Sequence, residues 1–291
     1  MDDFRKYSLN LHGRLMEIDR PLIMGIINAT PDSFYNASRT LEPELIAERA
    51  GIMLREGADI IDIGACSTRP GAQLVDENEE IKRLDVAIKA VRASTGNDVI
   101  ISVDTFRADV ARHCVEHLGV DIVNDISGGD LDPLMHSTIA QLQVPYIVMH
   151  MRGTPSTMQQ FTDYNGDVAA VVLEQLAQKV DDLHQQGIND VIADPGFGFA
   201  KTTEQNYRLI SRLEVFHALR VPLLVGISRK SMIQQALRCQ AQDALNGTTV
   251  LNTIALLKGA HILRVHDVKA AVEARTIVGL LNSNSQSDSD N

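Results

Sequence analysis

Short apolar runs recur along the chain, and each is followed by a longer segment with apolar residues at every third or fourth position. The short runs are typical of buried strands, and the longer segments are typical of amphipathic helices. We expect eight strands, at residues 22–27, 60–63, 99–103, 121–123, 146–149, 191–193, 223–225 and 261–265.

The segments between these strands place their apolar residues on one face of a helix. The stripes are Ile46, Ala50, Met53 and Leu54; Ile81, Leu84, Ile88 and Val91; Val168, Val171, Val172, Leu176, Val180 and Leu183; and Val268, Val272 and Leu280. Eight strand–helix repeats over this length predict an α/β fold, a (β/α)8 TIM barrel. An open doubly wound sheet is the alternative, and the lack of an early Gly-rich phosphate fingerprint makes it the weaker one.

Both ends of the chain differ from the repeating part. Residues 4–18 alternate around His12-Gly13, which predicts a β-hairpin that caps the bottom of the barrel. Residues 282–291 are polar and acidic, and we expect a disordered tail there. Residues 1–281 then form a single domain.

Composition and charge narrow the class of protein. With 291 residues and 44% hydrophobic residues, the chain can bury a large core. No run approaches the roughly 18 apolar residues that cross a bilayer, and the first residues contain no apolar core of an export signal. The net charge of −11 argues against a nucleic-acid partner, and three widely spaced cysteines predict neither a disulfide framework nor a metal site. We expect a cytoplasmic protein without a membrane partner.

Polar residues stand where the predicted strands end, which is where barrel enzymes carry their active sites. At a single strand, such a residue only marks the start of a loop. Eight strands that end this way would bring buried carboxylates and amides together, and those need a ligand or one another. The residues are Asn28, Asp62, Asp104, Asn124, His150, Asp194, Ser228 with Lys230, and Arg264 with His266.

The sequence LLVGISRKS at 223–231 illustrates this pattern. A buried strand leads into a helix whose first N–H groups are unpaired. With Arg229 and Lys230 beside them, these groups suit an anion or a carbonyl.

Eight blocks around these strand ends together resemble the dihydropteroate synthase family of pterin-binding enzymes. They occur in the family's order and cover the chain from about residue 21 to residue 272. The blocks are MGIINATPDSF (24–34), DIIDIGACSTRPGA (59–72), SVDTF (102–106), VNDISGG (123–129), MHMRGTPSTMQ (149–159), DPGFGFAKT (194–202), GISRKS (226–231) and RVHDV (264–268).

The resemblance implies a transferase of folate synthesis. It would condense 6-hydroxymethyl-7,8-dihydropterin pyrophosphate with 4-aminobenzoate to give 7,8-dihydropteroate and pyrophosphate. Asp194, Asn124 and Lys230 have the acceptors and donors that the edge of a pterin needs. The resemblance places Asp104 at the other end of the pterin, where a carboxylate favours the positive charge of the reaction. Met149 would form an apolar wall, although it could equally belong to the core.

Pyrophosphate requires cations, because it leaves with several negative charges. Arg264 and His266, two residues apart, can reach it together, and Thr68 and Arg69 lie in the loop after the second strand. We expect Mg²⁺ as the cofactor, and the resemblance makes Asn28 its ligand. The catalytic set is then Asp104, Lys230, Arg264 and His266. For His266 alone, a structural role would be the simpler interpretation.

The second substrate needs a site for a carboxylate and walls for a ring. Ser231 and the N–H groups of the helix after Arg229 suit the carboxylate, although Ser231 could instead be a helix cap. The resemblance places Phe34, Thr68, Pro70 and Phe199 around the ring. The loops 29–40 and 65–77 are long, and we expect them to act as lids that order around the pterin substrate before 4-aminobenzoate binds.

Some positions depart from the family's pattern, and three other functions are compatible with parts of it. The first loop reads DSFYNASR without a Gly pair, Ala65-Cys66 replaces Gly-Glu, and Ala29 stands where Val is commoner. Cys66 fits a packed small residue better than a reactive thiol. The alternatives are a methyltetrahydrofolate methyltransferase, a pterin-binding protein without catalysis, and an unrelated phosphate-binding barrel. The resemblance also implies a homodimer through the last helices.

Overall fold

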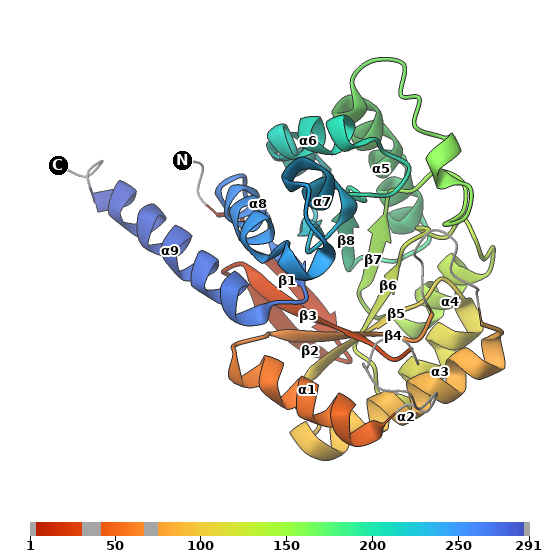
Figure 1. The fold of residues 1–291 in the computed structure, drawn as a ribbon. Helices are drawn as coiled ribbons and strands as arrows, with labels where there is room; N and C mark the ends of the chain where they lie inside the picture. Colours follow the sequence, from red (N-terminus) through yellow and green to blue (C-terminus); the bar gives the residue numbers. More distant parts are fainter. Residues whose placement is uncertain (1–3, 31–41, 67–74, 288–291) are drawn as a thin grey trace.

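The computed structural model describes residues 4–30, 42–66 and 75–287, and eight parallel strands within these ranges form one sheet (Figure 1). The order is β8-β7-β6-β5-β4-β3-β10-β9, and an isolated bridge between Ala193 and Leu223 joins the two outer strands. The sheet is therefore the barrel that the sequence predicts. The strands are β3 (Leu22–Asn28), β4 (Ile60–Gly64), β5 (Ile100–Asp104), β6 (Ile122–Asp125), β7 (Tyr146–Met149), β8 (Val191–Asp194), β9 (Leu224–Val225) and β10 (Ile262–Val265).

Helices follow the strands and surround the barrel (Figure 1). Their apolar stripes face the sheet, as in α2, where Leu84, Ile88 and Val91 are fully buried. The helices are α1 (Pro43–Arg55), α2 (Glu77–Thr95), α3 (Ala108–Leu118), α4 (Met135–Leu142), α5 (Val168–Gln185), α6 (Thr203–Ser211), α7 (Ser231–Leu237), α8 (Leu245–Leu257) and α9 (Val268–Ser287). Short 3-10 segments are η1 (Met158–Gln160), η2 (Leu213–Leu219) and η3 (Ala241–Asp243).

The N-terminal hairpin closes the amino-terminal end of the barrel. Strands β1 (Tyr7–Leu11) and β2 (Arg14–Ile18) pair antiparallel around the predicted turn. Leu9, Leu11 and Ile18 are buried in one apolar cluster with residues from the first halves of the barrel strands. The prediction of a hairpin that caps the barrel bottom is confirmed.

Alternation along the strands separates the barrel interior from the helix-facing side. Along β4, Ile61 and Ile63 belong to the cluster under the helices, and Ile60 belongs to the cluster at the barrel bottom. Asp62 and Gly64 follow Ile60 on the interior side, and Ile60 shares its apolar cluster with Met24, Ile122 and Ile262. The interior is thus apolar below and polar toward the carboxyl ends of the strands.

The last helix differs from its prediction at two points. It continues to Ser287, so 282–287 are helical and the boundary of the predicted tail is too early; residues 288–291 lie outside the described ranges. Leu280 is 61% exposed and is not part of the buried stripe. Figure 1 shows why: the final turns of α9 project beyond the strands of the barrel. Within the described ranges no helix is long and apolar enough to cross a membrane.

Candidate active site

A charged cluster occupies the centre of the barrel near the carboxyl ends of the strands. The Nε of Arg264 donates to Oδ2 of Asp62 at 2.6 Å, and its Nη2 donates to Oδ2 of Asp104 at 2.6 Å. The side-chain amide of Asn124 lies 3.3 and 3.4 Å from the two oxygens of Asp62. These hydrogen bonds join four side chains from β4, β5, β6 and β10 that are far apart in the sequence.

Burial changes the acidity of Asp104. Its side chain is 16% exposed, and burial raises its pKa from 3.8 to about 7. Arg264 opposes this shift, and the neighbouring charge of Asp62 adds to it. At neutral pH the carboxyl group therefore exchanges readily between its two protonation states.

Asp194 and Lys230 lie on the other side of this interior. A Cβ on Gly226 would lie 3.9 Å from Oδ2 of Asp194 and 3.8 Å from Cβ of Arg264, so Asp194 and Arg264 face the same space. Burial raises the pKa of Asp194, and the charge of Lys230 opposes the shift. Burial lowers the pKa of Lys230 to about 8, and Asp194 in turn favours its charged form.

The loop after β8 holds both groups in place. The Gly196 N–H donates to Oδ1 of Asp194 at 2.8 Å, and Nζ of Lys230 donates to the Phe197 carbonyl at 2.5 Å. Nζ also lies 4.7 Å from the centre of the Phe199 ring. Gly196 has φ +70°, and a Cβ there would lie 2.0 Å from the His150 carbonyl oxygen, so only glycine fits this turn.

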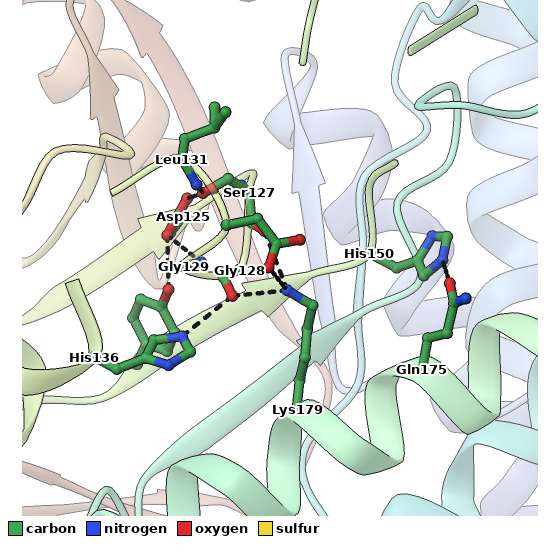
Figure 2. A network of polar contacts seen from close by, with 11 residues as sticks. Asp125, Ser127, Gly128, Gly129, Leu131, His136, His150, Gln175 and Lys179 are labelled. Atoms are coloured by element: carbon green, nitrogen blue, oxygen red, sulfur yellow. Dashed lines mark hydrogen bonds and ion pairs between the residues drawn. The ribbon is translucent and has the colours of Figure 1, made fainter. Parts of the chain in front are cut away.

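A buried lysine fastens the same loop from behind. Nζ of Lys201 donates to the carbonyls of Gly196 at 2.9 Å and Phe199 at 3.0 Å, and it lies 3.0 Å from Nδ1 of His150. The other ring nitrogen of His150 lies 2.8 Å from Oε1 of Gln175 (Figure 2). Burial lowers the pKa of both Lys201 and His150 well below the ordinary values. His150, which the strand-end pattern groups with the site, is bonded on both ring nitrogens within this network.

A second network fixes the loop after β6, next to Asn124. Asp125 accepts from the N–H and hydroxyl of Ser127, from the Gly129 N–H and from the Tyr146 hydroxyl, at 2.7 to 2.8 Å (Figure 2). Burial raises the pKa of Asp125, and these hydrogen bonds oppose the shift. These four donors anchor Asp125 to its loop and to Tyr146, while the side chain of the preceding Asn124 lies at Asp62.

Apolar side chains form a wall beside the charged cluster. Met149, 3% exposed, belongs to a cluster with Phe106, Ile126 and Met158, and Phe199 packs against the same cluster. The structure places Met149 at the end of β7, so it serves both as core and as a neighbour of the strand ends.

The segment after β9 separates the two cations predicted there. Arg229 has φ +56°, and its guanidinium donates to both carboxylate oxygens of Asp267 at 2.8 and 2.5 Å, away from the cluster of Lys230. Ser231 is exposed and begins α7, and Lys230 occupies the cap position, so the interpretation of Ser231 as a cap is wrong. His266 follows β10, and its Nδ1 lies 3.1 Å from the Ser228 hydroxyl.

Four predicted site residues, Phe34, Thr68, Arg69 and Pro70, lie outside the described ranges, as do most residues of the two predicted lids. Asn28 ends β3 and is half-buried. At the departures from the family pattern, Ala29 and Ala65 are fully buried, and burial raises the pKa of the Cys66 thiol, as in a packed small residue.

The end of the second predicted lid is tied to the barrel. The guanidinium of Arg107 is ion-paired with Glu80 and donates to the Val75 carbonyl at 2.7 Å. Glu80 also accepts from the Thr105 hydroxyl at 2.7 Å. Burial raises the pKa of Glu80, and Thr105 and Arg107 oppose the shift. Thr105, which belongs to this anchor, directly follows Asp104 in the chain.

The sequence assigns no role to two buried charged residues near the site, Asp62 and Lys201. Asp62 stands between two isoleucines of a predicted strand, and Lys201 stands within the motif DPGFGFAKT, but neither pattern reveals a partner. Only the fold shows what each one bonds.

Comparisons with known proteins identify the family of the chain. A family model described as pterin binding enzyme matches residues 24–266. A dihydropteroate synthase of Escherichia coli (strain K12) is 40% identical over 273 residues, which cover 93% of this chain and 95% of that protein.

Solved structures match over nearly the whole length. The Yersinia pestis dihydropteroate synthase in a sulfonamide drug complex has a TM-score of 0.87 and 37% identity, covering 96% of this chain and 100% of that one. The Xanthomonas albilineans dihydropteroate synthase in complex with 7,8-dihydropteroate has a TM-score of 0.83 and 33% identity, covering 95% of this chain and 99% of that one.

Proposed function

The chain belongs to the pterin-binding enzyme family and catalyses the dihydropteroate synthase reaction, and on this premise we propose which side chains carry each part of it. The transferase joins the methylene carbon on C6 of 6-hydroxymethyl-7,8-dihydropterin pyrophosphate to the amino nitrogen of 4-aminobenzoate. The C–O bond to pyrophosphate breaks, a C–N bond forms, and the nitrogen releases a proton to solvent water. One observation carries the assignment: Asp104, Asn124, Asp194 and Lys230 gather at the carboxyl ends of the barrel strands.

The floor of the site would bind the pterin by its polar edge. Asp194 accepts from the amino group and N3, Asn124 donates and accepts, and Lys230 donates to the carbonyl. With a pKa of about 8, Lys230 is about nine-tenths protonated at pH 7. Met149 and Phe199 supply the apolar and aromatic walls.

Asp104 would act on the reacting end of the pterin. As the C–O bond breaks, positive charge develops on the methylene carbon and the ring. An ionised carboxylate in a largely buried position stabilises that charge more than it would in water. We assign no general base, because the amine of 4-aminobenzoate is uncharged at neutral pH and attacks directly.

The leaving pyrophosphate would meet Arg264 and His266. The guanidinium of Arg264 uses Nε and Nη2 for Asp62 and Asp104, and no acceptor among the described residues takes the N–H groups of Nη1. Those groups are the ones we assign to the pyrophosphate. Thr68 and Arg69, outside the described ranges, complete the predicted set.

Mg²⁺ is the cofactor that we propose, with Asn28 as its protein ligand. The described residues hold no cluster of three His, Cys, Asp or Glu side chains suited to a metal, so the fit rests on the Asn28 amide oxygen together with pyrophosphate and water oxygens. When bound, Mg²⁺ neutralises charge on the leaving group. Asn28→Ala should raise the Mg²⁺ concentration for half-maximal rate and weaken Mg²⁺-dependent binding of pyrophosphate in calorimetry.

The ring of 4-aminobenzoate would lie against Phe199, with Phe34, Thr68 and Pro70 as further walls. Its carboxylate would bind Ser231 and the N–H groups at the start of α7, where the exposed hydroxyl supports such a contact. We propose that the pterin substrate binds first. Equal affinity of 4-aminobenzoate for the free and the pterin-loaded enzyme would contradict this order.

A turnover assay tests the function. The enzyme is supplied with dihydropterin pyrophosphate, Mg²⁺ and 4-aminobenzoate, and dihydropteroate is measured. A protein that only binds pterins would show saturable binding and no product. A methyltransferase would transfer a methyl group from methyltetrahydrofolate and form no dihydropteroate.

We also propose a homodimer in the cytoplasm. Val250 and Leu257 of α8 and Ile277, Leu280 and Leu281 of α9 are more than 40% exposed, and α8 packs beside α9. Such apolar surface supports association of two copies. The free thiols of the described cysteines suit a reducing compartment. Sedimentation of the wild type and of Leu280→Glu tests the dimer: the wild type should sediment as a dimer and the variant as a monomer.

A further inference from the structure

Asp62 is a buried carboxylate to which the reaction, as proposed, gives no role. It is 0% exposed and lies on β4, at the level of Ser102 on β5, below the level of Gly64 and Asp104. Its oxygens meet Nε of Arg264 at 2.6 Å and the side-chain amide of Asn124 at 3.3 and 3.4 Å. It thus lies underneath two residues that we place at the substrate.

Packing of the barrel interior does not require a charged residue at position 62. The interior residues below it, such as Ile60, Ile122 and Ile262, are apolar and fully buried. A buried carboxylate has a large desolvation cost unless good partners offset it, and an apolar side chain of similar size is often at least as stable. The role of Asp62 therefore depends on the functions of its two partners, Asn124 and Arg264.

Asp62 determines which way the Asn124 amide faces. An ionised carboxylate only accepts hydrogen bonds, so the NH₂ group of Asn124 must point at it. The amide oxygen of Asn124 then points away from Asp62 as an acceptor. In the same way, Nε of Arg264 is bound to Asp62 and its Nη2 to Asp104, which leaves Nη1 on the outer edge of the guanidinium.

We propose that Asp62 is a positioning residue that presents the oxygen of Asn124 to the pterin and Nη1 of Arg264 to the pyrophosphate, without touching either. This inference rests on the proposed function of the site. Asp62 lies one level below the substrate and orients the residues that contact it. Its loss should therefore affect substrate binding as well as turnover.

The test is Asp62→Asn, with Ser102→Ala as the matched control. Ser102 is 0% exposed, lies beside Asp62 in the strand register, and its hydroxyl has no partner among the described residues. In Asp62→Asn, kcat/KM for the pterin substrate should fall roughly ten- to a hundredfold, the range for one hydrogen bond to a charged group. Affinity for 6-hydroxymethylpterin and for pyrophosphate should fall in calorimetry, and Ser102→Ala should stay within about twofold of the wild type.

The pH profile separates positioning from general damage. The charged groups that act on Asp104 are Arg264, Asp62, Glu80 and Asp125. Removing the Asp62 charge lowers the pKa of Asp104, so the acid limb of kcat/KM should move to lower pH in Asp62→Asn. A loss caused only by a damaged fold reduces the rate at every pH and leaves the limb where it was.

The test distinguishes a wrong inference about Asp62 from a wrong assignment of the reaction. If the wild type forms no dihydropteroate, the function is wrong; if the wild type is active and Asp62→Asn matches it, the inference is wrong. Should Asp62→Asn not fold, Asp62→Ser removes the charge with fewer atoms and is assayed in the same way. A wild-type crystal with bound pterin gives an independent answer: an Asp62 oxygen within hydrogen-bond distance of the ligand would overturn the positioning role.

Discussion

The pH dependence of the reaction should report the ionisation of Asp104. Burial raises its pKa to about 7. On the proposed mechanism, the rate depends on the ionised form. A group with this pKa is about nine-tenths ionised at pH 8 and about one-tenth ionised at pH 6. We therefore expect kcat/KM for the pterin substrate to fall roughly tenfold over those two pH units, because a protonated Asp104 no longer stabilises positive charge.

The assay compares the wild type with Asp104→Asn between pH 5.5 and about 8.5. The variant keeps the shape of the side chain and removes its charge. It should therefore react more slowly, and its pH profile of kcat/KM should lack the acid limb that Asp104 produces. Its affinity for pterin should change less than kcat. The pyrophosphate group of the substrate has ionisations of its own, and these affect both proteins equally. The difference between the two profiles therefore belongs to Asp104.

A matched control is Glu204→Gln, on the outer surface of α6. Its side chain is 74% exposed and pairs with Arg208 one turn away. Its profile should overlay that of the wild type. The reasoning is refuted if the wild type shows no loss of kcat/KM from pH 8 to pH 6, or if Asp104→Asn retains the same limb at full height.

Three further substitutions test the supports of the site. Arg264→Ala leaves two buried carboxylates without their guanidinium, so the free energy of unfolding should fall by about 3–5 kcal/mol; an unchanged midpoint in urea would contradict this. Gly196→Ala places a Cβ 2.0 Å from the His150 carbonyl at φ +70°, so the melting temperature and pterin affinity should both drop. Lys201→Met leaves two loop carbonyls unpaired, with an expected loss of about 1–3 kcal/mol of stability and a raised KM for 4-aminobenzoate; an unchanged KM would remove Lys201 from the support of Phe199.

The strands and the hairpin were predictable because their signals are local. Apolar runs bounded by polar residues placed the strands to within about a residue at most ends, since a parallel strand covered on both faces is apolar over most of its length. The polar residue after each run was equally visible. Leu280 was misassigned because periodicity alone does not tell where a helix passes the edge of the barrel.

The pairings inside the site were not predictable from the sequence. Arg229 and Lys230 are adjacent cations in one motif, and nothing local indicates which of them faces the site. The structure turns Arg229 to Asp267 through a residue with φ +56°, and Lys230 alone reaches the loop after β8. The bonds from Arg264 to Asp62 and Asp104 join residues 202 and 160 positions apart, and only the order of the strands in the sheet, β5-β4-β3-β10, brings them together.

The charged residues of the barrel interior favour formation of the pterin cation over binding of the pyrophosphate anion. Three carboxylates, Asp62, Asp104 and Asp194, lie close to the cations Arg264 and Lys230. Ionised carboxylates in a buried place oppose the binding of an anion but stabilise a pterin cation. Burial raises the pKa of Asp104 to about 7, so near neutral pH a proton removes its charge part of the time. The cation that forms as pyrophosphate leaves would take over the role of that proton. On the proposed mechanism, neutralisation of pyrophosphate would then come from groups such as Nη1 of Arg264, which has no acceptor among the described residues.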